Sequence, residues 1–409
     1  MNKKKIINDP IYGFINITSE LIFDLIAHPY FQRLRRIKQL GIAEYVYPGA
    51  HHTRFHHALG AMHLMQEAIS TLRSKGHLIT DEEDEAAQIA ILLHDIGHGP
   101  FSHLLESILL DGVHHEQLSL LIMQELNHCF DQKITLAIAM FEDKYERPFF
   151  HQLISSQLDV DRMDYLNRDS FFTGVKEGFI GADRIIKMIN VVDNQLVVEE
   201  KGIYSVENFL TARRLMYWQV YLHKTAISAE SMLIIVLKRA KELIQNGEIV
   251  YASDSLLNFL SNKINYQTFV GNKNYLKDFT SIDDNDIWYC VKNWVNHSDK
   301  ILSSLSKMLL ERKLFKILIS DKPFDDETIT KIKNELIENY KLSNQELSYF
   351  IHLGTTSNEA YVSGKKNINI LSKNNKIQDI ADASDLSNIK ALTNIVKKYY
   401  VCWAKDVYL

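Results

Sequence analysis

The sequence predicts a mainly α-helical protein, and three observations support this prediction. Two stretches, residues 20–40 and 229–244, place apolar side chains at positions i, i+3, i+4 and i+7, which is the spacing of one helical face. Only 6 prolines and 16 glycines interrupt the 409 residues, and both residue types tend to end helices. Hydrophobic residues make up 46% of the chain, which is enough to fill a large core.

Two helices are predicted around polar residues. One begins in HHTRFHHALG, residues 51–60, where Arg54 and His57 are three residues apart and point to one face. The other runs through LDVDRMDYLNRDS, residues 158–170. One face of this helix carries three polar side chains at a spacing of four residues. These side chains are Asp161, Tyr165 and Asp169.

The stretch ILLHDIGHGP, residues 91–100, ends an apolar helix in groups that are costly to bury. His94, Asp95 and His98 follow three aliphatic residues. A buried imidazole or carboxylate needs compensation, and a bound cation compensates it most strongly. The stretch therefore predicts a metal site. The residues expected to stop the helix and turn the chain are Gly97, Gly99 and Pro100.

Two further segments predict strands. Residues 191–202, VVDNQLVVEEKG, have β-branched stretches on both sides of Asp193 and Asn194, a pattern typical of a small hairpin. Residues 360–380 alternate in the manner of a strand and contain turn-forming Gly and Asn. Composition changes near residue 245, so we predict a catalytic domain over 1–245. A C-terminal helical lobe with some strand, packed on that domain, is predicted over 246–409.

Charge and cysteine usage exclude several classes of protein. The chain has 46 basic and 51 acidic residues and a formal net charge of −5, which argues against a general nucleic-acid binder or a polybasic membrane binder. Its three cysteines are far apart and form no CxxC pair, which indicates a reducing compartment. No apolar run approaches about 18 residues, and no signal peptide is evident. We expect a cytoplasmic protein without membrane contact.

Histidine is concentrated in one part of the chain. Eleven of the 17 histidines fall between His51 and His115, where an even spread would give about three. Imidazole together with carboxylate suits Mn, Fe, Zn, Co or Ni better than calcium, whose sites use oxygen alone. Ordinary surface or core histidines are expected at positions away from the motifs: His28, His63, His77, His128, His151, His297 and His352.

Five stretches, in this order, resemble a known family. They are INDPIYGFI at 7–15, FQRLRRIKQLG at 31–41, YVYPGAHHTRFHHALG at 45–60, HDIGHGPFSH at 94–103 and LDVDRMDYLNRDS at 158–170. Together they resemble the deoxynucleoside triphosphate triphosphohydrolases of the HD-domain superfamily, one animal member of which carries a sterile-alpha-motif domain before its HD domain. The resemblance covers residues 5 to about 240 and implies the helical HD fold. Because it begins at residue 5, no preceding sterile-alpha-motif domain is expected.

The resemblance also implies the residues of the reaction. One divalent transition metal (Mn, Fe, Zn, Co or Ni), with additional Mg as a candidate, is implied at His57, His94, Asp95 and Asp161. The implied catalytic histidines are His98, His103 and His115, the last with Glu116 in a supporting network. We favour His103 as the general acid and His98 as a phosphate contact. As an alternative, His98 and His103 cap the helix end or bond loop carbonyls.

Substrate contacts follow from the same resemblance. It implies that Gln39 and Leu40 contact the nucleoside, that Tyr165 packs on the sugar, and that Asp169 bonds the 3′-OH. Spacing alone says only that Tyr165 and Asp169 share the face of Asp161. Arg is the preferred partner of phosphate because its planar fork donates two hydrogen bonds. The candidates around the triphosphate are Arg54, Arg162, Arg213 and Lys224. Tyr221 is a further candidate for substrate binding, and Arg214 is expected on a solvated helix face.

A second nucleotide site is implied near the N-terminus. Lys5, Asn8 and Arg35 match the family's activator site, and Ile6 is a close substitute. Ala27 stands where a guanine-reading Asp is expected, and an Ala side chain cannot accept the hydrogen bonds that a guanine edge offers. Control by guanine nucleotides is therefore not expected, whereas another activator nucleotide could use the remaining residues.

The leading hypothesis is an enzyme that cleaves dNTPs, with dGTP a candidate preferred substrate, to a deoxynucleoside and inorganic triphosphate. One alternative is another HD phosphohydrolase, such as a nucleotidase or a phosphodiesterase of a signalling nucleotide. Another is a nucleotide sensor without turnover. The resemblance implies a homo-oligomer, either a dimer or a tetramer.

Overall fold

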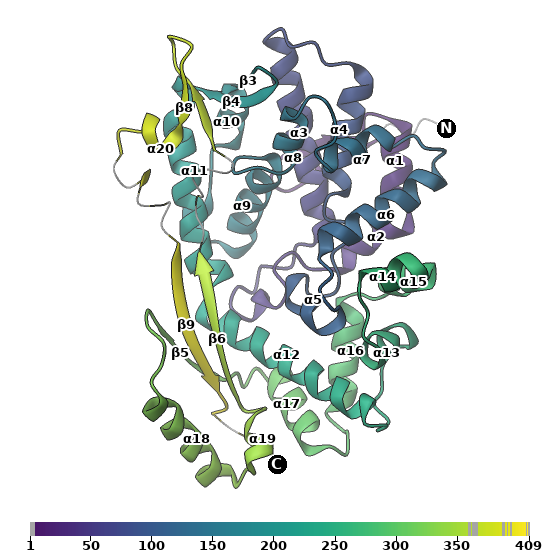
Figure 1. Cartoon of the computed structure of the whole chain (residues 1–409), viewed down its shortest axis with the longest axis vertical. Coiled ribbons are helices and arrows are strands. Elements are labelled where there is room, and N and C mark those ends of the chain that lie inside the picture. Colours follow the sequence, from purple (N-terminus) through teal and green to yellow (C-terminus); the bar gives the residue numbers. More distant parts are fainter. Residues whose placement is uncertain are drawn as a thin grey trace.

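The computed structural model confirms a mainly helical fold with small sheets (Figure 1). It describes residues 5–358, 361, 367–386, 389–390, 392, 395–405 and 407, without the side chains of residues 103, 105 and 107. In Figure 1 the helices of the first half of the chain gather around α3, and a long strand pair runs down to the C-terminal helices.

The helices up to residue 245 include the central helix α3, on which α4, α9 and α10 pack. They are α1 (Glu20–Ala27), α2 (Pro29–Gln32), α3 (Arg54–Ser74), α4 (Asp81–Leu93), α5 (His103–Leu109), α6 (His115–Cys129), α7 (Thr135–Phe141), α8 (Phe149–Ile154), α9 (Val160–Thr173), α10 (Ala182–Met188), α11 (Ile203–Met216) and α12 (Lys224–Gln245). Short 3₁₀ turns are η1 (Arg33–Arg36), η2 (Ala43–Tyr45), η3 (Lys176–Gly178) and η4 (Glu200–Gly202), and η5 (Tyr217–Tyr221) is a turn of π-helix. Helix α3 is buried on most of its surface, since it packs against both α4 and α9.

The remaining helices follow α12. They are α13 (Asp254–Ser261), α14 (Tyr266–Gly271), α15 (Lys273–Ser281), α16 (Asp284–Trp294), α17 (Lys300–Leu310), α18 (Asp326–Tyr340), α19 (Asn344–Leu347) and α20 (Ile380–Ala383). Helices α16 and α17 bury an apolar stripe against each other, and α17 also packs on α12.

Three small sheets complete the described fold. The first is the antiparallel hairpin of β1 (Ile6–Asp9) and β2 (Gly13–Asn16). The second has the order β3 (Ile189–Val192), β4 (Gln195–Glu199), β7 (Asn369–Leu371) and β8 (Ile377–Asp379). The third has the order β5 (Lys316–Ser320), β9 (Val396–Trp403) and β6 (Ile351–Asn358).

The predicted hairpin and helices are confirmed, with one difference. Asp193 and Asn194 both have positive φ, 50° and 58°, as a two-residue hairpin turn requires. The periodic stretch 20–40, however, forms three short pieces instead of one helix. His28 is extended with ψ 140° because it precedes Pro29, which begins α2.

The C-terminal segment contributes a strand to a sheet that begins in the first part of the chain. The predicted boundary at 245 coincides with the end of α12, but β7 pairs in parallel with β4 through Val198 and Ile370. Of the predicted strand segment 360–380, β7 and β8 are confirmed, whereas residues 360 and 362–366 lie outside the described residues. The division into two domains remains a prediction.

Within the described part of the chain, no single helix is long and apolar enough to cross a membrane. One bent pair, Glu200–Tyr221 with Lys224–Gln245, satisfies length and composition together.

Candidate active site

Three helices bring the predicted metal ligands together. His57 lies in the first turn of α3, whose start is capped by Thr53 and His56. His94 directly follows the last residue of α4. Asp161 lies in the first turn of α9, where the Asp159 carboxylate caps the helix by accepting from the Arg162 amide. The three side chains therefore converge from well-defined helix ends.

The ligand atoms are close enough to share one ion. The Oδ1 atom of Asp161 is 3.1 Å from His57 Nε2 and 3.4 Å from His94 Nε2. Asp95 approaches the same two nitrogens, with its Oδ2 3.7 Å from His57 Nε2 and its Oδ1 3.4 Å from His94 Nε2. We call His57, His94, Asp95 and Asp161 the metal cluster.

The protonation pattern of the metal cluster fits a cation. His94 Nδ1 lies 2.6 Å from the Ile91 carbonyl and must donate to it. In a neutral ring, His94 Nε2 then presents a lone pair toward two carboxylates. The Nε2 atoms of His57 and His94 are both buried and have no hydrogen-bond partner among the described residues. Two lone pairs and two carboxylates facing one another require a positive charge between them.

The pKa values support the same conclusion. Burial opposes the charge on His57, but its contacts with Asp161 and Asp164 outweigh burial and raise its pKa to about 10. The pKa of Asp161 is lowered because its contacts with His57 and His94 outweigh the opposing effect of burial. Without an ion, the imidazoles of the cluster thus take up protons and become positively charged. A divalent metal at the same position would supply that positive charge instead.

A buried ion-pair network orients His57 from behind. The His57 Nδ1 atom is 2.7 Å from Asp164 Oδ2, and Arg168 donates to both oxygens of Asp164 at 2.9 Å. Arg168 also donates to Asp9 Oδ2 at 2.8 Å, at the end of β1. Gly60 permits this packing, because a Cβ there would lie 2.0 Å from Asp164 Oδ1. We call Asp164, Arg168 and Asp9 the backing network of the metal cluster.

A second group of side chains lies beside the metal cluster. Asp95, His98 and His115 have ligand atoms within 4.8 Å of one another, and we call them the second cluster. The rings of His98 and His115 stack with centroids 3.9 Å apart. His115 also lies 3.1 Å from Glu106, whereas the predicted Glu116 is 3.4 Å away with its side chain 63% exposed. Of the two carboxylates beside His115, Glu106 is less exposed than Glu116, and the sequence did not predict Glu106.

Backbone geometry shapes the loop that carries the second cluster. A Cβ at Gly97 would lie 2.2 Å from the Ser119 amide, so only glycine lets α6 pack this close to the loop. Phe101 and Ser102 both have positive φ, 52° and 53°, which strains non-glycine residues. The Asp284 carboxylate accepts from the Phe101 amide at 2.8 Å, and Ser102 Oγ accepts from Arg54 at 2.7 Å. These bonds hold the strained turn in place.

His98 is neutral at physiological pH in this arrangement. Burial, and then the nearby Arg54 guanidinium, lower its pKa well below the ordinary value. A neutral imidazole carries one donor and one acceptor nitrogen, which suits a phosphate contact. His103 begins α5, but its side chain lies outside the described residues.

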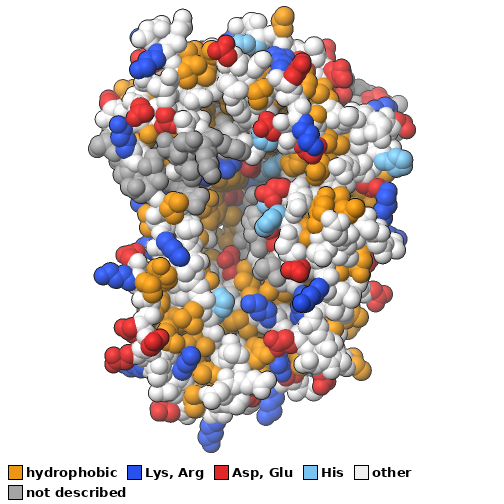
Figure 2. All heavy atoms as spheres, in the orientation of Figure 1, with side chains coloured by type: hydrophobic (Ala, Val, Ile, Leu, Met, Phe, Trp, Pro, Cys, Tyr) orange, Lys and Arg blue, Asp and Glu red, His pale blue; other side chains and the backbone are white. Residues whose placement is uncertain are grey.

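One cavity of about 620 Å³ adjoins both clusters. Figure 2 shows a hollow near the centre of one face, with histidine and acidic side chains at its edge. Of the predicted residues, ten line the cavity: Gln39, Leu40, Arg54, Asp95, His98, His115, Asp161, Tyr165, Asp169 and Tyr221. Its other lining residues are Gly41, Ala43, Phe101, Ser102, Leu104, Tyr217, Val220, Ala226, Glu230 and Ile234.

The cavity wall beside Asp161 combines an aromatic ring with a carboxylate. Tyr165 and Asp169 follow Asp161 on one face of α9. One Asp169 oxygen lies 2.7 Å from His52 Nε2, and the other accepts from Tyr221 Oη at 2.7 Å. Tyr221 comes from η5, and π-helical turns are frequent at functional sites. His52 is a partner that the sequence did not predict.

The predicted basic residues occupy different positions. Arg54 lines the cavity and donates to Asp95 and Ser102. Arg162 pairs with Asp159 at 2.7 Å, and Arg213 donates to Gln157 at 3.0 Å. Lys224 is exposed at the start of α12. Arg162, Arg213 and Lys224 are absent from the cavity lining given by the described residues.

The predicted activator residues lie on two elements. Ile6 and Asn8 belong to β1, and Lys5 directly precedes it. Arg35 lies in η1, bonds Gln32 at 2.9 Å and covers the Phe55 ring at 3.6 Å. Ile6 is 64% exposed.

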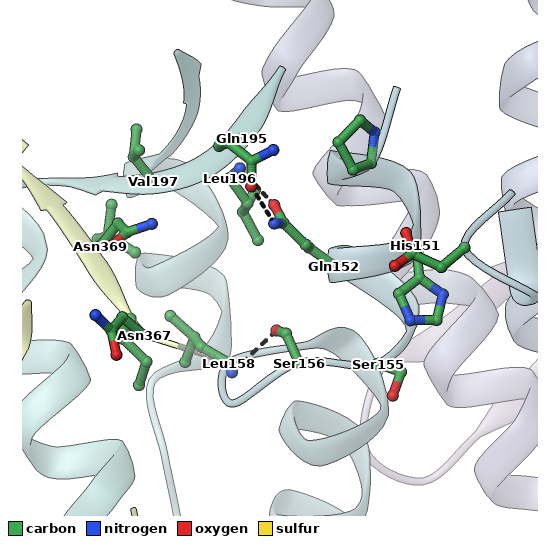
Figure 3. Close-up of a pocket in the computed structure, with 14 residues that line it drawn as sticks. His151, Gln152, Ser155, Ser156, Leu158, Gln195, Leu196, Val197, Asn367 and Asn369 are labelled. Atoms are coloured by element: carbon green, nitrogen blue, oxygen red, sulfur yellow. Dashed lines mark hydrogen bonds between the residues drawn. The ribbon is translucent and has the colours of Figure 1, made fainter. Parts of the chain in front are cut away.

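A second cavity, of about 510 Å³, lies between α8, β4 and β7 (Figure 3). Gln152 points across it, but its amide donates to Gln195 and its oxygen accepts from the Leu196 amide at 2.7 Å. These bonds fasten α8 to β4. This cavity has no group of metal ligands among the residues that the structure describes.

Comparisons with known proteins agree with this geometry. Residues 54–169 match the HD domain, and residues 180–268 match the HD associated region. The solved structure of a phosphohydrolase from Bacteroides thetaiotaomicron VPI-5482 is 51% identical, covers 98% of this chain and 100% of its own, and has a TM-score of 0.94. The uncharacterized protein YwfO of Bacillus subtilis (strain 168) is 31% identical over 94% of this chain and 88% of its own length.

A third relative carries a named activity. The deoxynucleoside triphosphate triphosphohydrolase SAMHD1 homolog of Dictyostelium discoideum is 34% identical over 62% of this chain and 54% of its own length. The chain belongs to the HD-domain family, in the group that resembles the dNTP triphosphohydrolases. It is a phosphohydrolase whose His and Asp clusters are suited to a divalent metal.

Proposed function

We propose that the protein hydrolyses dNTPs to a deoxynucleoside and inorganic triphosphate. The observation that supports this most is that Asp161, Tyr165 and Asp169 line one cavity from one face of α9. In a nucleotide the α-phosphate is joined to C5′ of the sugar, so a phosphate at Asp161 brings the sugar over Tyr165. The similarity to a dNTP triphosphohydrolase supports the same substrate class.

In this proposal the metal cluster holds one divalent transition metal: Mn, Fe, Zn, Co or Ni. A metal bound there would supply Lewis-acid chemistry to a phosphate oxygen and would lower the pKa of a water molecule at neutral pH. The backing network keeps the His57 Nδ1 atom occupied by Asp164, so that Nε2 faces the ion. An additional Mg would accompany the triphosphate.

The histidines of the loop handle the phosphate and the proton. When water attacks the α-phosphorus, the bond from phosphorus to the 5′-oxygen breaks, and that oxygen leaves with the bonding electron pair. It needs a proton, and imidazole can supply one near neutral pH. We assign this proton to His103 at the start of α5 and the phosphate contact to neutral His98. His115, with Glu106 and Glu116 as neighbours, supports His98 by stacking.

Basic side chains offset the charge of the triphosphate. Arg54 uses two of its five N–H donors on Asp95 and Ser102, which leaves up to three for phosphate oxygens. Arg162 and Arg213 supply positive charge next to Tyr165, whose pKa they lower against the larger effect of burial. Lys224 would meet the distal phosphates from the start of α12.

The sugar is read by Tyr165 and Asp169. A ring packed against C2′ excludes a 2′-OH by shape, and each Asp169 oxygen keeps a lone pair for the 3′-OH. The change Tyr165→Ala is expected to narrow the ratio of kcat/KM for dGTP over GTP by about tenfold, because a steric clash is removed. The ratio is measured with both nucleotides in one assay. An unchanged ratio of kcat/KM would mean that a residue other than Tyr165 excludes the 2′-OH.

Product analysis tests the activity itself. The four dNTPs are incubated singly and mixed with metal-loaded protein, in Mn or in Mg, and the products are separated. Deoxynucleoside and inorganic triphosphate are the expected products. Release of phosphate, pyrophosphate or a nucleoside monophosphate would identify another HD phosphohydrolase, and tight binding without turnover would identify a sensor.

Assembly and activation belong to the same proposal. We expect a homodimer or homotetramer, with an activator nucleotide bound near Lys5, Ile6, Asn8 and Arg35. Light scattering with and without each dNTP measures the subunit number. A mixed-substrate rate above the sum of the single rates would reveal activation.

A further inference from the structure

Glu230 faces the active-site cavity from a side that the proposed reaction does not use. It lies on α12 with Ala226 and Ile234, four residues before and after it, and the three line the cavity along one helical face. Leu40, Gly41 and Ala43 line the same cavity. The carboxyl group therefore shares this cavity with a largely apolar set of side chains.

No hydrogen bond or ion pair involves the Glu230 carboxyl group across the described ranges of the chain. Burial raises its pKa to about 7, and no neighbouring charge contributes to the shift. The residue is half-buried, and the partial loss of hydration around its carboxyl group disfavours the charged form, which costs free energy. Packing of α12 does not explain it either, because the helix buries other residues, such as Met232 and Leu233. A ligand that hydrogen-bonds the carboxyl group would compensate this cost.

A second unpartnered acceptor belongs to the same cavity. The Gln39 Oε1 atom is buried without a hydrogen-bond partner in the described structure, and Gln39 lines the cavity. The phosphates belong at the histidines and the sugar at Tyr165, so the remaining part of a nucleotide, its base, is left for Gln39 and Glu230. A carboxylate is also unsuited to phosphate, since like charges repel.

The chemistry of the base edges decides which base fits. Guanine presents two adjacent donors, N1–H and the N2 amino group, which can bond both oxygens of one carboxylate. Adenine and cytosine present one donor beside an acceptor, and thymine presents one donor between two acceptors. A carboxylate accepts only, so it pairs fully with guanine alone.

We propose that Glu230, together with Gln39, reads the base edge of the substrate and makes the guanine deoxynucleotide the preferred substrate. This inference rests on the proposed dNTP hydrolysis. Gln39 would use its amide group for the remaining polar atoms of the base edge.

The test is Glu230→Gln, which keeps the length of the side chain and replaces one acceptor with a donor. Each dNTP is assayed for kcat/KM with the metal-loaded protein. We expect the value for dGTP to fall about 10- to 100-fold, which corresponds to losing a hydrogen bond to a charged group. The value for dTTP should not fall, because the new amide group accepts from N3–H and donates to O4 of thymine. Glu248→Gln, an exposed carboxylate just beyond α12, is the matched control.

Two outcomes would overturn the inference. An equal fall for all four dNTPs would make Glu230 a structural residue, and an unchanged ratio of dGTP to dTTP would remove it from base reading. The metal content and melting temperature of Glu230→Gln identify misfolded protein.

Measuring nucleotide binding tests this inference independently of the proposed hydrolysis. If wild-type protein releases no triphosphate from any dNTP, the proposed hydrolysis fails, and equilibrium binding of dGTP and dTTP still tests Glu230. The binding is measured on metal-loaded protein that also carries His98→Ala, with and without Glu230→Gln. Loss of guanine preference in the double variant supports the inference, and equal binding of the two nucleotides before the change contradicts it.

Discussion

The two clusters of the active site are built in different ways. The metal cluster is held by helix ends and by the backing network, in which Asp164 and Arg168 are fully buried. The second cluster lies on a loop whose backbone is strained at Phe101 and Ser102. The imidazoles of His98 and His115 stack on each other, and the Glu106 carboxylate of α5 contacts His115.

This difference in construction matches two different tasks, which are to hold a metal permanently and to bind and release a triphosphate. Buried ion pairs lock a geometry because breaking one partner leaves an uncompensated charge. Stacking of the His98 and His115 rings is a weaker restraint than a buried ion pair, because breaking it leaves no charge uncompensated. A metal must stay in place through every turnover, whereas the groups that hold a triphosphate must also release it. The rigid cluster therefore suits the metal and the adjustable one suits the product.

The largest expected effect comes from removing a metal ligand. In Asp161→Ala the ligand that bridges toward His57 and His94 is lost, so metal and activity should both disappear. Metal content is measured by atomic emission and activity by product release. Full activity with bound metal would contradict the assignment of the metal cluster.

The next effect tests the second cluster. We expect His98→Ala to lower kcat by about 10²-fold while metal content stays the same, since imidazoles that move protons or hold phosphate contribute at this level. His128→Ala, on an exposed position of α6, is the control. Loss of metal in His98→Ala would show that His98 also helps to hold the ion, next to the Asp95 side chain that both clusters share.

A smaller effect is expected from the backing network. Asp164→Asn keeps the shape of the side chain but removes the charge that orients His57 and pairs with Arg168. Metal affinity should fall about 10- to 100-fold, measured by titration with Mn²⁺ and detected by electron paramagnetic resonance. Asp183→Asn, exposed on α10, is the control. Unchanged affinity would mean that the α3 helix alone fixes His57.

The smallest effect concerns the support of the loops. Asp284 accepts from the amides of Lys38 and Phe101, both at 2.8 Å, and burial raises its pKa to about 6. The folded protein therefore binds more protons than the unfolded chain between pH 6 and 4, so this group stabilises the fold as the pH falls. Asp284→Asn cannot titrate. The free energy of unfolding of wild type minus that of the variant should rise by up to about 3 kcal/mol from pH 7 to 4.

Urea unfolding at several pH values measures this difference. A difference independent of pH would show that Asp284 has the same pKa in both states.

The sequence predicted local features of the site better than distant ones. Helices around His57 and Asp161 followed from spacing within one segment, and so did the turn after His94. The role of Asp164 could not be predicted, because it depends on His57, 107 residues away, although its position three residues after Asp161 is a signal that spacing offers. Asp284 supports loops from 246 residues away, and no local pattern marks it.

Metal binding also depends on the order in which the chain is made. The pair of Asp9 and Arg168 joins residues 159 positions apart, and domains fold during synthesis from the N-terminus onward. His57 leaves the ribosome long before α9, and until α9 arrives nothing orients its ring. All four side chains of the metal cluster can therefore hold one ion only after α9 has folded against α3.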